Sequence, residues 1–82
     1  MFVITAVQAR TEAKYGSRAE RYVKLEAGHA AQNLLLQAVA LDLGAVPVGA
    51  FGDLEVRRVL DLPDGEEPLY LIAVGRPAPA QP

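Results

Sequence analysis

Residues 26–51 read EAGHAAQNLLLQAVALDLGAVPVGAF, and this stretch decides the fold. Between Ala27 and Leu43 the apolar residues fall on almost every side of a helix, interrupted by one narrow polar stripe at helical spacing. The stripe consists of His29, Gln32, Asn33 and Gln37, which we interpret as a hydrogen-bonded seam between helices. A helix that is apolar nearly all round has to be buried. We therefore predict that Leu34–Leu36 are sheltered by protein outside this chain.

The ends of this helix are predicted from capping patterns. Ser17-Arg18-Ala19-Glu20 fits the capping box, in which the serine and the glutamate satisfy free backbone N–H groups, so the helix is predicted to begin near Ser17. It is predicted to end at Leu43, because Gly44 suits the left-handed turn that closes many helices. Gly28 lies inside the helix and is a candidate for a bend.

Short apolar runs on both sides of the helix predict strands. Phe2–Val7 is nearly unbroken and contains β-branched residues, which is typical of an interior strand covered on both faces. Leu69–Val74 predicts a further strand. Ala45–Phe51 predicts a short extended stretch, too irregular for a central strand because of Pro47 and Gly49.

The remaining segments predict a loop, a second helix and a turn. Gln8–Ser17 is polar and predicts a loop. Asp53 is a plausible cap for a helix that has Val56, Val59 and Leu60 on one face. Leu62–Gly65 predicts a turn, since proline fixes one backbone angle and glycine permits the next. Together the elements indicate an α+β fold in which the first and last strands pair antiparallel.

The size and composition predict one small domain that is marginally stable by itself. We place this domain at residues 1–77 and a Pro/Ala-rich tail at residues 78–82 of the 82-residue chain. Hydrophobic residues make up 51% of the sequence, a high share for so small a domain. This surplus favours a homodimer or larger assembly over a monomer.

Several classes of function are disfavoured by what the sequence contains. It has no cysteine, so no disulfide framework is expected and we expect a cytoplasmic location. Its single histidine, His29, has no neighbouring ligands, so no protein metal site is expected. A net charge of −2 without a basic block argues against nucleic acid as a partner. The opening MFVITAV has no basic start and is too short to span a bilayer, so no membrane partner is expected.

Three segments in series resemble a known family. Residues 26–51, followed by VRRVLDLP (56–63) and PLYLIAVGRP (68–77), are similar in order and spacing to the C-terminal half of FMN-dependent nitroreductases. The preceding KYGSRAERYVKLEAGH (14–29) resembles the SagB-type dehydrogenases, a branch that includes enzymes oxidising azoline rings. The resemblance implies a partial nitroreductase-like fold, with antiparallel strands packed on a long buried helix in an interlocked dimer that binds FMN between its subunits.

The same resemblance implies candidate site residues. Pro47, Val48, Gly49 and Ala50 match the loop that lies beside the flavin ring, where small residues let the backbone approach and donate a hydrogen bond. Arg76 matches the start of a segment that carries basic residues to the flavin phosphate. Lys14 and Tyr15 match a Lys-Tyr pair implicated in azoline oxidation. A lysine whose pKa is lowered by burial can serve as a base, and a tyrosine can relay or donate a proton.

The resemblance also implies what a complete flavin site needs. The family's arginine-rich phosphate-binding segment and its serine-containing flavin loop belong to an N-terminal half that these residues do not match. We therefore expect FMN binding, and action on a small organic substrate, to depend on a second copy of the chain or on a separate chain carrying that half. The alternative is a non-catalytic remnant or dimerisation module that binds no flavin.

Overall fold

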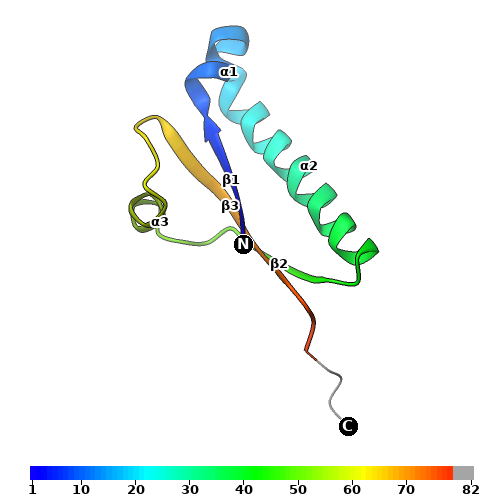
Figure 1. Cartoon of the computed structure of the whole chain (residues 1–82). Helices are drawn as coiled ribbons and strands as arrows, with labels where there is room; N and C mark the ends of the chain where they lie inside the picture. Colours follow the sequence, from blue (N-terminus) through cyan, green and yellow to red (C-terminus); the bar gives the residue numbers. More distant parts are fainter. Residues whose placement is uncertain (79–82) are drawn as a thin grey trace.

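A computed structural model describes residues 1–78 as an α+β fold in which one long helix lies along a small sheet (Figure 1). In chain order the elements are β1 (Phe2–Val7), α1 (Gln8–Tyr15), the 3-10 turn η1 (Gly16–Arg18), α2 (Ala19–Ala40), β2 (Gly44–Val48), α3 (Asp53–Leu60) and β3 (Glu66–Gly75). Within this described range no helix is both long and apolar enough to cross a membrane. Most of the predicted tail lies outside the described residues.

The sheet has three strands in the order β1-β3-β2, and β3 pairs antiparallel with both neighbours. Phe2 lies opposite Ile72 and Val7 opposite Glu66, which confirms the predicted pairing of the first and last strands. The prediction that β1 is an interior strand is wrong for this chain. β1 lies at one edge of the described sheet and Phe2 is 53% exposed, because the chain has too few elements to cover both faces of an apolar strand.

Helix α2 is shorter than predicted at both ends. It begins at Ala19, and Ser17 instead lies in η1, with no side-chain hydrogen bond capping α2. After Ala40 the chain reverses at Asp42, which takes a left-handed conformation (φ 58°), so Gly44 is free to begin β2. Gly28 lies within the helix without interrupting it. A non-glycine residue therefore closes α2, a role that the sequence assigned to glycine.

The predicted loop at residues 8–17 is wrong, because Gln8–Tyr15 forms helix α1. The segment has no buried residue, so its sequence carries no apolar stripe to reveal the helix. Several of its residues are strong helix formers, and this local preference decides the structure. Gly16 ends α1 with a positive φ of 57°, and its amide donates to the carbonyl oxygen of Glu12.

Helix α3 and the turn after it lie close to their predicted positions. Asp53 is the first residue of α3 and makes no capping hydrogen bond; Gly52 is the N-cap. The turn spans Pro63 to Glu66, one residue later than predicted, with a 3.1 Å hydrogen bond from the Glu66 amide to the Pro63 carbonyl oxygen and a positive φ of 85° at Gly65. Gly65 therefore adopts the backbone angle that the sequence predicted for a glycine in this turn.

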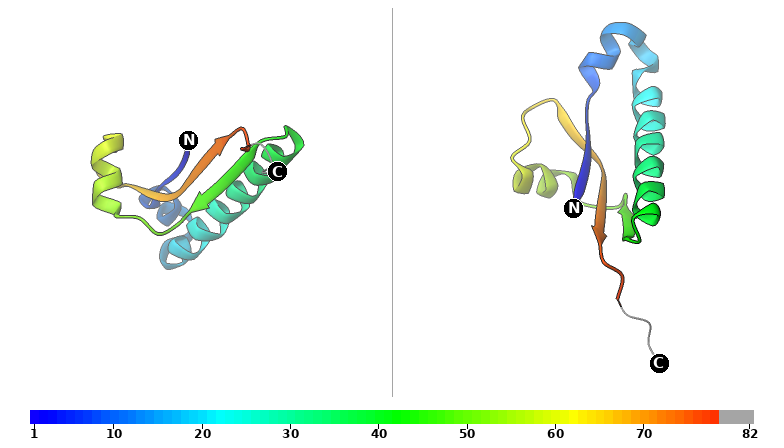
Figure 2. Two further views of the ribbon diagram at one scale, coloured as in Figure 1. Left: turned by 90° about the horizontal axis from the view of Figure 1, so that it is seen from below. Right: turned by 45° about the vertical axis from the view of Figure 1, so that its right-hand side comes forward.

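Helices α2 and α3 lie on opposite faces of the sheet (Figure 2). Phe2 and Val74 line a hollow of about 270 Å³ with the C-terminal half of α2. Val3 and Leu71, on the other face by strand alternation, line a hollow of about 250 Å³ with α3. The buried residues are Ala19, Ala27, Ala31, Ala38, Pro68 and Ile72. Apart from Pro68 and Ile72 of β3, the buried core therefore consists of alanines that let α2 approach the sheet closely.

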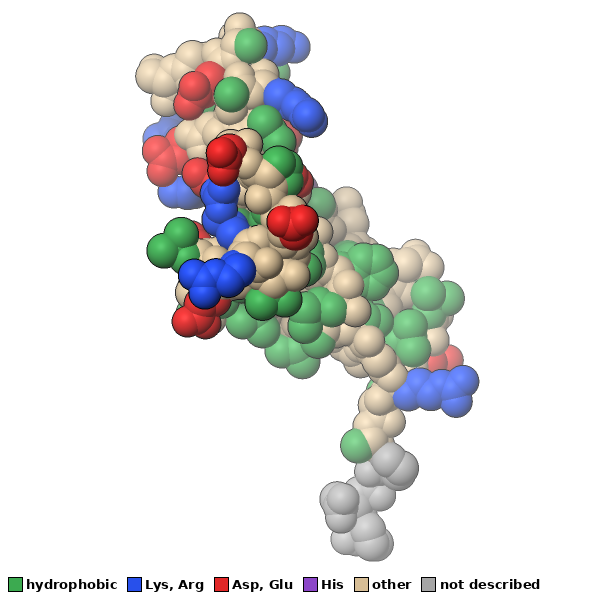
Figure 3. Space-filling model, turned by 60° about the vertical axis from the view of Figure 1, so that its left-hand side comes forward, with side chains coloured by type: hydrophobic (Ala, Val, Ile, Leu, Met, Phe, Trp, Pro, Cys, Tyr) green, Lys and Arg blue, Asp and Glu red, His purple; other side chains and the backbone are tan. Residues whose placement is uncertain are grey.

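The molecule is elongated, and much of its apolar surface is open. Its extents are 53 × 26 × 17 Å and its radius of gyration is 15.1 Å, against about 12 Å for a compact chain of this length. The accessible surface is 6315 Å², against roughly 4,800 Å² for a compact monomer of this mass. Hydrophobic side chains gather on the lower part of the face seen in Figure 3. On α2, Leu36 is 59% and Val39 is 72% exposed, so this chain does not itself shelter the helix.

Candidate functional site

The four residues predicted to face a flavin ring lie at the end of β2. Pro47 and Val48 pair with β3, and Gly49 and Ala50 follow before α3; all four are exposed. A Cβ atom on Gly49 would meet only Cε1 of Tyr70, at the ordinary contact distance of 3.7 Å, and Gly49 has no positive φ. The chain's own fold therefore does not require glycine here, and the small residue leaves the backbone open to approach from outside.

The backbone amides of Gly49 and Ala50 are the donors this loop offers. Among the hydrogen bonds of the described residues, none outside the sheet ladder uses either amide. Donors on exposed small residues can contact the edge of a flat ring without a side chain in the way. The loop thus fits the ring of a flavin.

Arg76 lies far from this loop. It follows the last residue of β3, which pairs with Gly44 at the start of β2, whereas Gly49 follows the end of β2. At 3.3 Å per residue the two positions are roughly 20 Å apart. Arg76 is exposed and makes no ion pair within the described residues. A phosphate group needs several convergent donors, so the residues present fit the flavin ring better than its phosphate.

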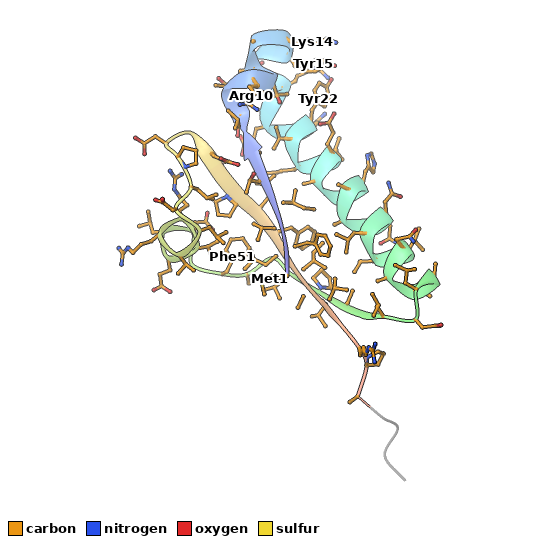
Figure 4. The ribbon with its side chains drawn as sticks, viewed as in Figure 1. Met1, Arg10, Lys14, Tyr15, Tyr22 and Phe51 are labelled. Atoms are coloured by element: carbon orange, nitrogen blue, oxygen red, sulfur yellow. The ribbon has the colours of Figure 1, made fainter. Side chains whose placement is uncertain are left out.

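Lys14 and Tyr15 end helix α1, and the structure brings them together with Tyr22 of α2 (Figure 4). The Lys14 Nζ atom lies 5.3 Å from the centroid of the Tyr15 ring. The Tyr15 and Tyr22 rings meet edge to face, with centroids 4.9 Å apart. Lys14 is exposed and Tyr15 is 45% exposed, so the burial needed for a catalytic lysine has to come from another surface.

Sequence reasoning missed Tyr22. The spacing of seven residues gives no signal for this contact, because Tyr15 ends α1 and Tyr22 lies in α2. The two rings meet only because α1 folds back onto α2. The same face of α2 carries His29, which lines a shallow hollow with both tyrosines.

The predicted site residues do not form one site within this chain. Figure 4 shows Lys14 and Tyr15 beyond one end of the sheet, whereas Phe51, next to Ala50, lies near the middle of the molecule. Arg76 follows the opposite end of β3. The predicted seam of His29, Gln32, Asn33 and Gln37 is exposed, and none of its side chains hydrogen-bonds within the described residues. Any contact among these groups has to involve further protein.

The nitroreductase family profile matches residues 1–76. The chain belongs to the nitroreductase family. Over 76 residues it is 49% identical to a predicted nitroreductase of Methanocaldococcus jannaschii. Its fold is similar to two crystal structures assigned to nitroreductases: one from Anabaena variabilis, with a TM-score of 0.83 and 38% identity over 93% of this chain, and one from Ralstonia eutropha, with a TM-score of 0.85 and 27% identity over 95%.

This nitroreductase-family chain spans only part of the relatives it matches. It covers 37% of the Methanocaldococcus jannaschii protein, 37% of the Ralstonia eutropha chain and 16% of the Anabaena variabilis chain. The matched segment therefore corresponds to the partial nitroreductase-like fold that the sequence predicted.

Proposed function

We propose that this chain supplies the ring-facing part of an FMN-dependent oxidoreductase site. The observation that carries the proposal is the end of β2, where Gly49 and Ala50 are exposed, their amides donate no hydrogen bond outside the sheet ladder, and the fold itself does not need the glycine. Members of the nitroreductase family generally use flavin. Bound FMN supplies hydride transfer to a small organic substrate or oxidant.

The chain's own residues have distinct roles in this proposal. The Gly49 and Ala50 amides donate to the ring edge and hold its orientation, while Pro47 and Val48 anchor the loop to β3. Lys14 holds or accepts a proton and Tyr15 relays it, as in the SagB-type branch to which we assign the chain. The Lys14 Nζ atom lies 5.3 Å from the centroid of the Tyr15 ring, so both side chains can meet the same substrate surface.

The flavin phosphate needs protein beyond one copy of this chain. Arg76 provides a single guanidinium, roughly 20 Å from Gly49 along the ladder. A homodimer, or a separate chain carrying the rest of the family's fold, provides the other donors in the cytoplasm. The exposed Leu36 and Val39 of α2 support such an assembly, since a second surface that covers them removes apolar area from water.

The same scarcity of cations favours one other function. A remnant that keeps the core and the α2 surface for assembly, but binds no flavin, also needs no phosphate donors. The two functions differ in a direct measurement, because bound oxidised flavin colours the protein yellow.

The test is a titration of FMN into the purified chain, with and without the portion of the Methanocaldococcus jannaschii relative that lies outside the match. We expect FMN fluorescence to be quenched on binding when both polypeptides are present. Gly49→Ala should weaken binding roughly tenfold, because an added methyl group crowds the ring. Gly75→Ala is the matched control, since a Cβ there also makes no close contact, with nothing within 4 Å of it. Protein that is colourless once unbound FMN has been removed by gel filtration supports the remnant instead.

A further inference from the structure

Strand β1 has an open outer edge. Its inner side pairs with β3, and no other strand of the described residues lies on its outer side. The strand reads FVITAV and contains neither a proline nor a charged residue, two features that natural proteins use to keep an exposed edge from pairing. The register shift between Ile4 and Thr5 places the additional residue, Leu69, in β3, so the outer edge of β1 stays continuous. A further strand can therefore pair along β1.

Both faces of β1 border hollows with a mostly apolar lining. Val3 lines the hollow of about 250 Å³ under α3, in which Glu55 is the one charged residue. Phe2 lines the hollow of about 270 Å³ under α2, in which Gln37 is the one polar residue. Met1 is 78% exposed and Phe2 is 53% exposed. A strand added beside this end of β1 would therefore cover apolar surface on both faces of the sheet.

The two ends of β1 differ in what surrounds them. At the end that contains Val7, a hollow of about 340 Å³ holds Arg10 and Glu26 beside apolar residues. These two charged side chains form no ion pair within the described part of the chain. Figure 4 shows Arg10 at the opposite end of β1 from Met1. A strand lying along β1 thus meets apolar groups near Met1 and can place polar groups near Val7.

Two sources of such a strand differ in how the assembly ends. If one second copy pairs through β1 and another covers the outer side of α2, each chain has two self-complementary surfaces, and association can continue without closing. A strand of a different sequence covers the edge of β1 once and stops this growth. The chain covers 37% of the Methanocaldococcus jannaschii relative, so nearly two-thirds of that protein lies outside the match and is long enough to supply the strand. These observations favour the second source.

We propose that the edge of β1 receives a strand from the part of the family's fold that this chain does not span. The backbone of that strand pairs with β1, and its side chains alternate between the hollow under α3 and the hollow under α2. It is therefore apolar on both faces where it lies beside Met1–Val3. Docking at β1 shares with the proposed function the need for further protein, but it does not depend on flavin binding.

The test co-expresses the full chain with the portion of the Methanocaldococcus jannaschii relative that lies outside the match, and purifies the complex without added FMN. Amide hydrogen exchange followed by mass spectrometry compares the complex with the chain alone at low protein concentration. We expect exchange in residues 1–7 to slow roughly tenfold or more, because the outward amides of β1 gain hydrogen-bond partners. Residues 44–48, in the other outer strand, should exchange as before.

Phe2→Lys and Val46→Lys are matched variants, since Phe2 is 53% and Val46 is 59% exposed and they lie on the two outer strands. Circular dichroism checks that both variants fold. Phe2→Lys should raise the concentration at which the complex dissociates on dilution roughly tenfold or more, because a charge replaces an apolar contact. Val46→Lys should change it less than twofold. Size-exclusion chromatography over a dilution series measures both.

Three results would overturn the docking at β1. They are equal effects of the two variants, unchanged exchange of residues 1–7 in the complex, and homo-oligomers paired through β1 that persist beside an excess of the partner, because a second copy would then be the preferred occupant. A complex in which β1 is protected but which binds no FMN would support the docking and contradict the proposed function.

Discussion

The N-terminal third of α2 (Ala19–Glu26) and its C-terminal half (Ala30–Ala40) use the same helix in different ways. The C-terminal half packs on the sheet through Ala31 and Ala38 and turns Leu36 and Val39 outward. The N-terminal third contacts the end of α1 through Tyr22 and turns Arg21 and Lys24 outward. One continuous helix thus carries an apolar outer surface and a charged one. Helical periodicity in the sequence predicts that α2 forms. What each part of α2 contacts is decided by the elements packed beside it, which are α1 at one end and the sheet at the other.

The largest expected effect tests the inner side of the C-terminal half. Ile72 is fully buried in the sheet, on the face that α2 covers. Ile72→Ala should cost about 2–5 kcal/mol of unfolding free energy, because it leaves a cavity in a core otherwise made mainly of alanines. Urea denaturation at low protein concentration measures it. Val39→Ala on the outer side of the same half should cost less than about 0.5 kcal/mol; equal losses would contradict the assignment of the two sides.

The next largest effect is expected on self-association, through the exposed side of the C-terminal half of α2. If a second copy covers the C-terminal half, Leu36→Lys with Val39→Lys should weaken self-association roughly a hundredfold, since burying each side chain contributes about 1.5–3 kcal/mol. Analytical ultracentrifugation over a range of concentrations measures this. Leu25→Lys in the N-terminal third should leave the association unchanged. A wild-type chain that stays monomeric at high concentration would contradict the proposed assembly.

A smaller effect is expected where the C-terminal half ends. Asp42 has a left-handed backbone, and Asp42→Gly should raise the unfolding free energy by about 0.5–1 kcal/mol by relieving that conformation. In the N-terminal third, a substitution to glycine should instead lower the unfolding free energy. Glu26→Gly, inside the helix, should cost about 1 kcal/mol. Thermal unfolding followed by circular dichroism compares the two, and equal signs would show that Asp42 is not strained.

The smallest effect concerns the exposed ion pair of the N-terminal third. Glu20 and Lys24 are separated by one helical turn, with both side chains about two-thirds exposed. Glu20→Gln should cost about 0.3–0.5 kcal/mol in dilute buffer. The loss should vanish in roughly 1 M salt, where the Debye length is about 3 Å. A loss that persists in high salt would indicate that Glu20 has a packing role.

The sequence predicted the elements that have strong periodicity or clear turn chemistry. The long helix, the strand that became β3 and the antiparallel pairing of β1 with β3 are confirmed. Helix α1 could not be predicted from hydrophobic pattern, because none of its residues is buried. The end of α2 was misplaced because Asp42, not a glycine, adopts the left-handed conformation.

The candidate site was predicted less completely than the fold. The family resemblance, and not the residue pattern alone, pointed to Pro47–Ala50 and to Lys14 and Tyr15. Neither could reveal Tyr22 beside Tyr15, because that contact depends on how α1 folds back onto α2. Arg76 could not be placed relative to Gly49 without the strand register, which puts them at opposite ends of β2. The roles of these residues remain predictions.

The strand order β1-β3-β2 leaves both outer strands of the described sheet with unpaired backbone groups. Pro47 removes one donor from β2 and so makes that side a poor template for another strand, whereas β1 contains no proline. An isolated chain therefore exposes one open hydrogen-bonding edge to its neighbours. We expect purification without a binding partner to favour strand-to-strand polymerisation through β1, and a proline or lysine introduced there to improve solubility.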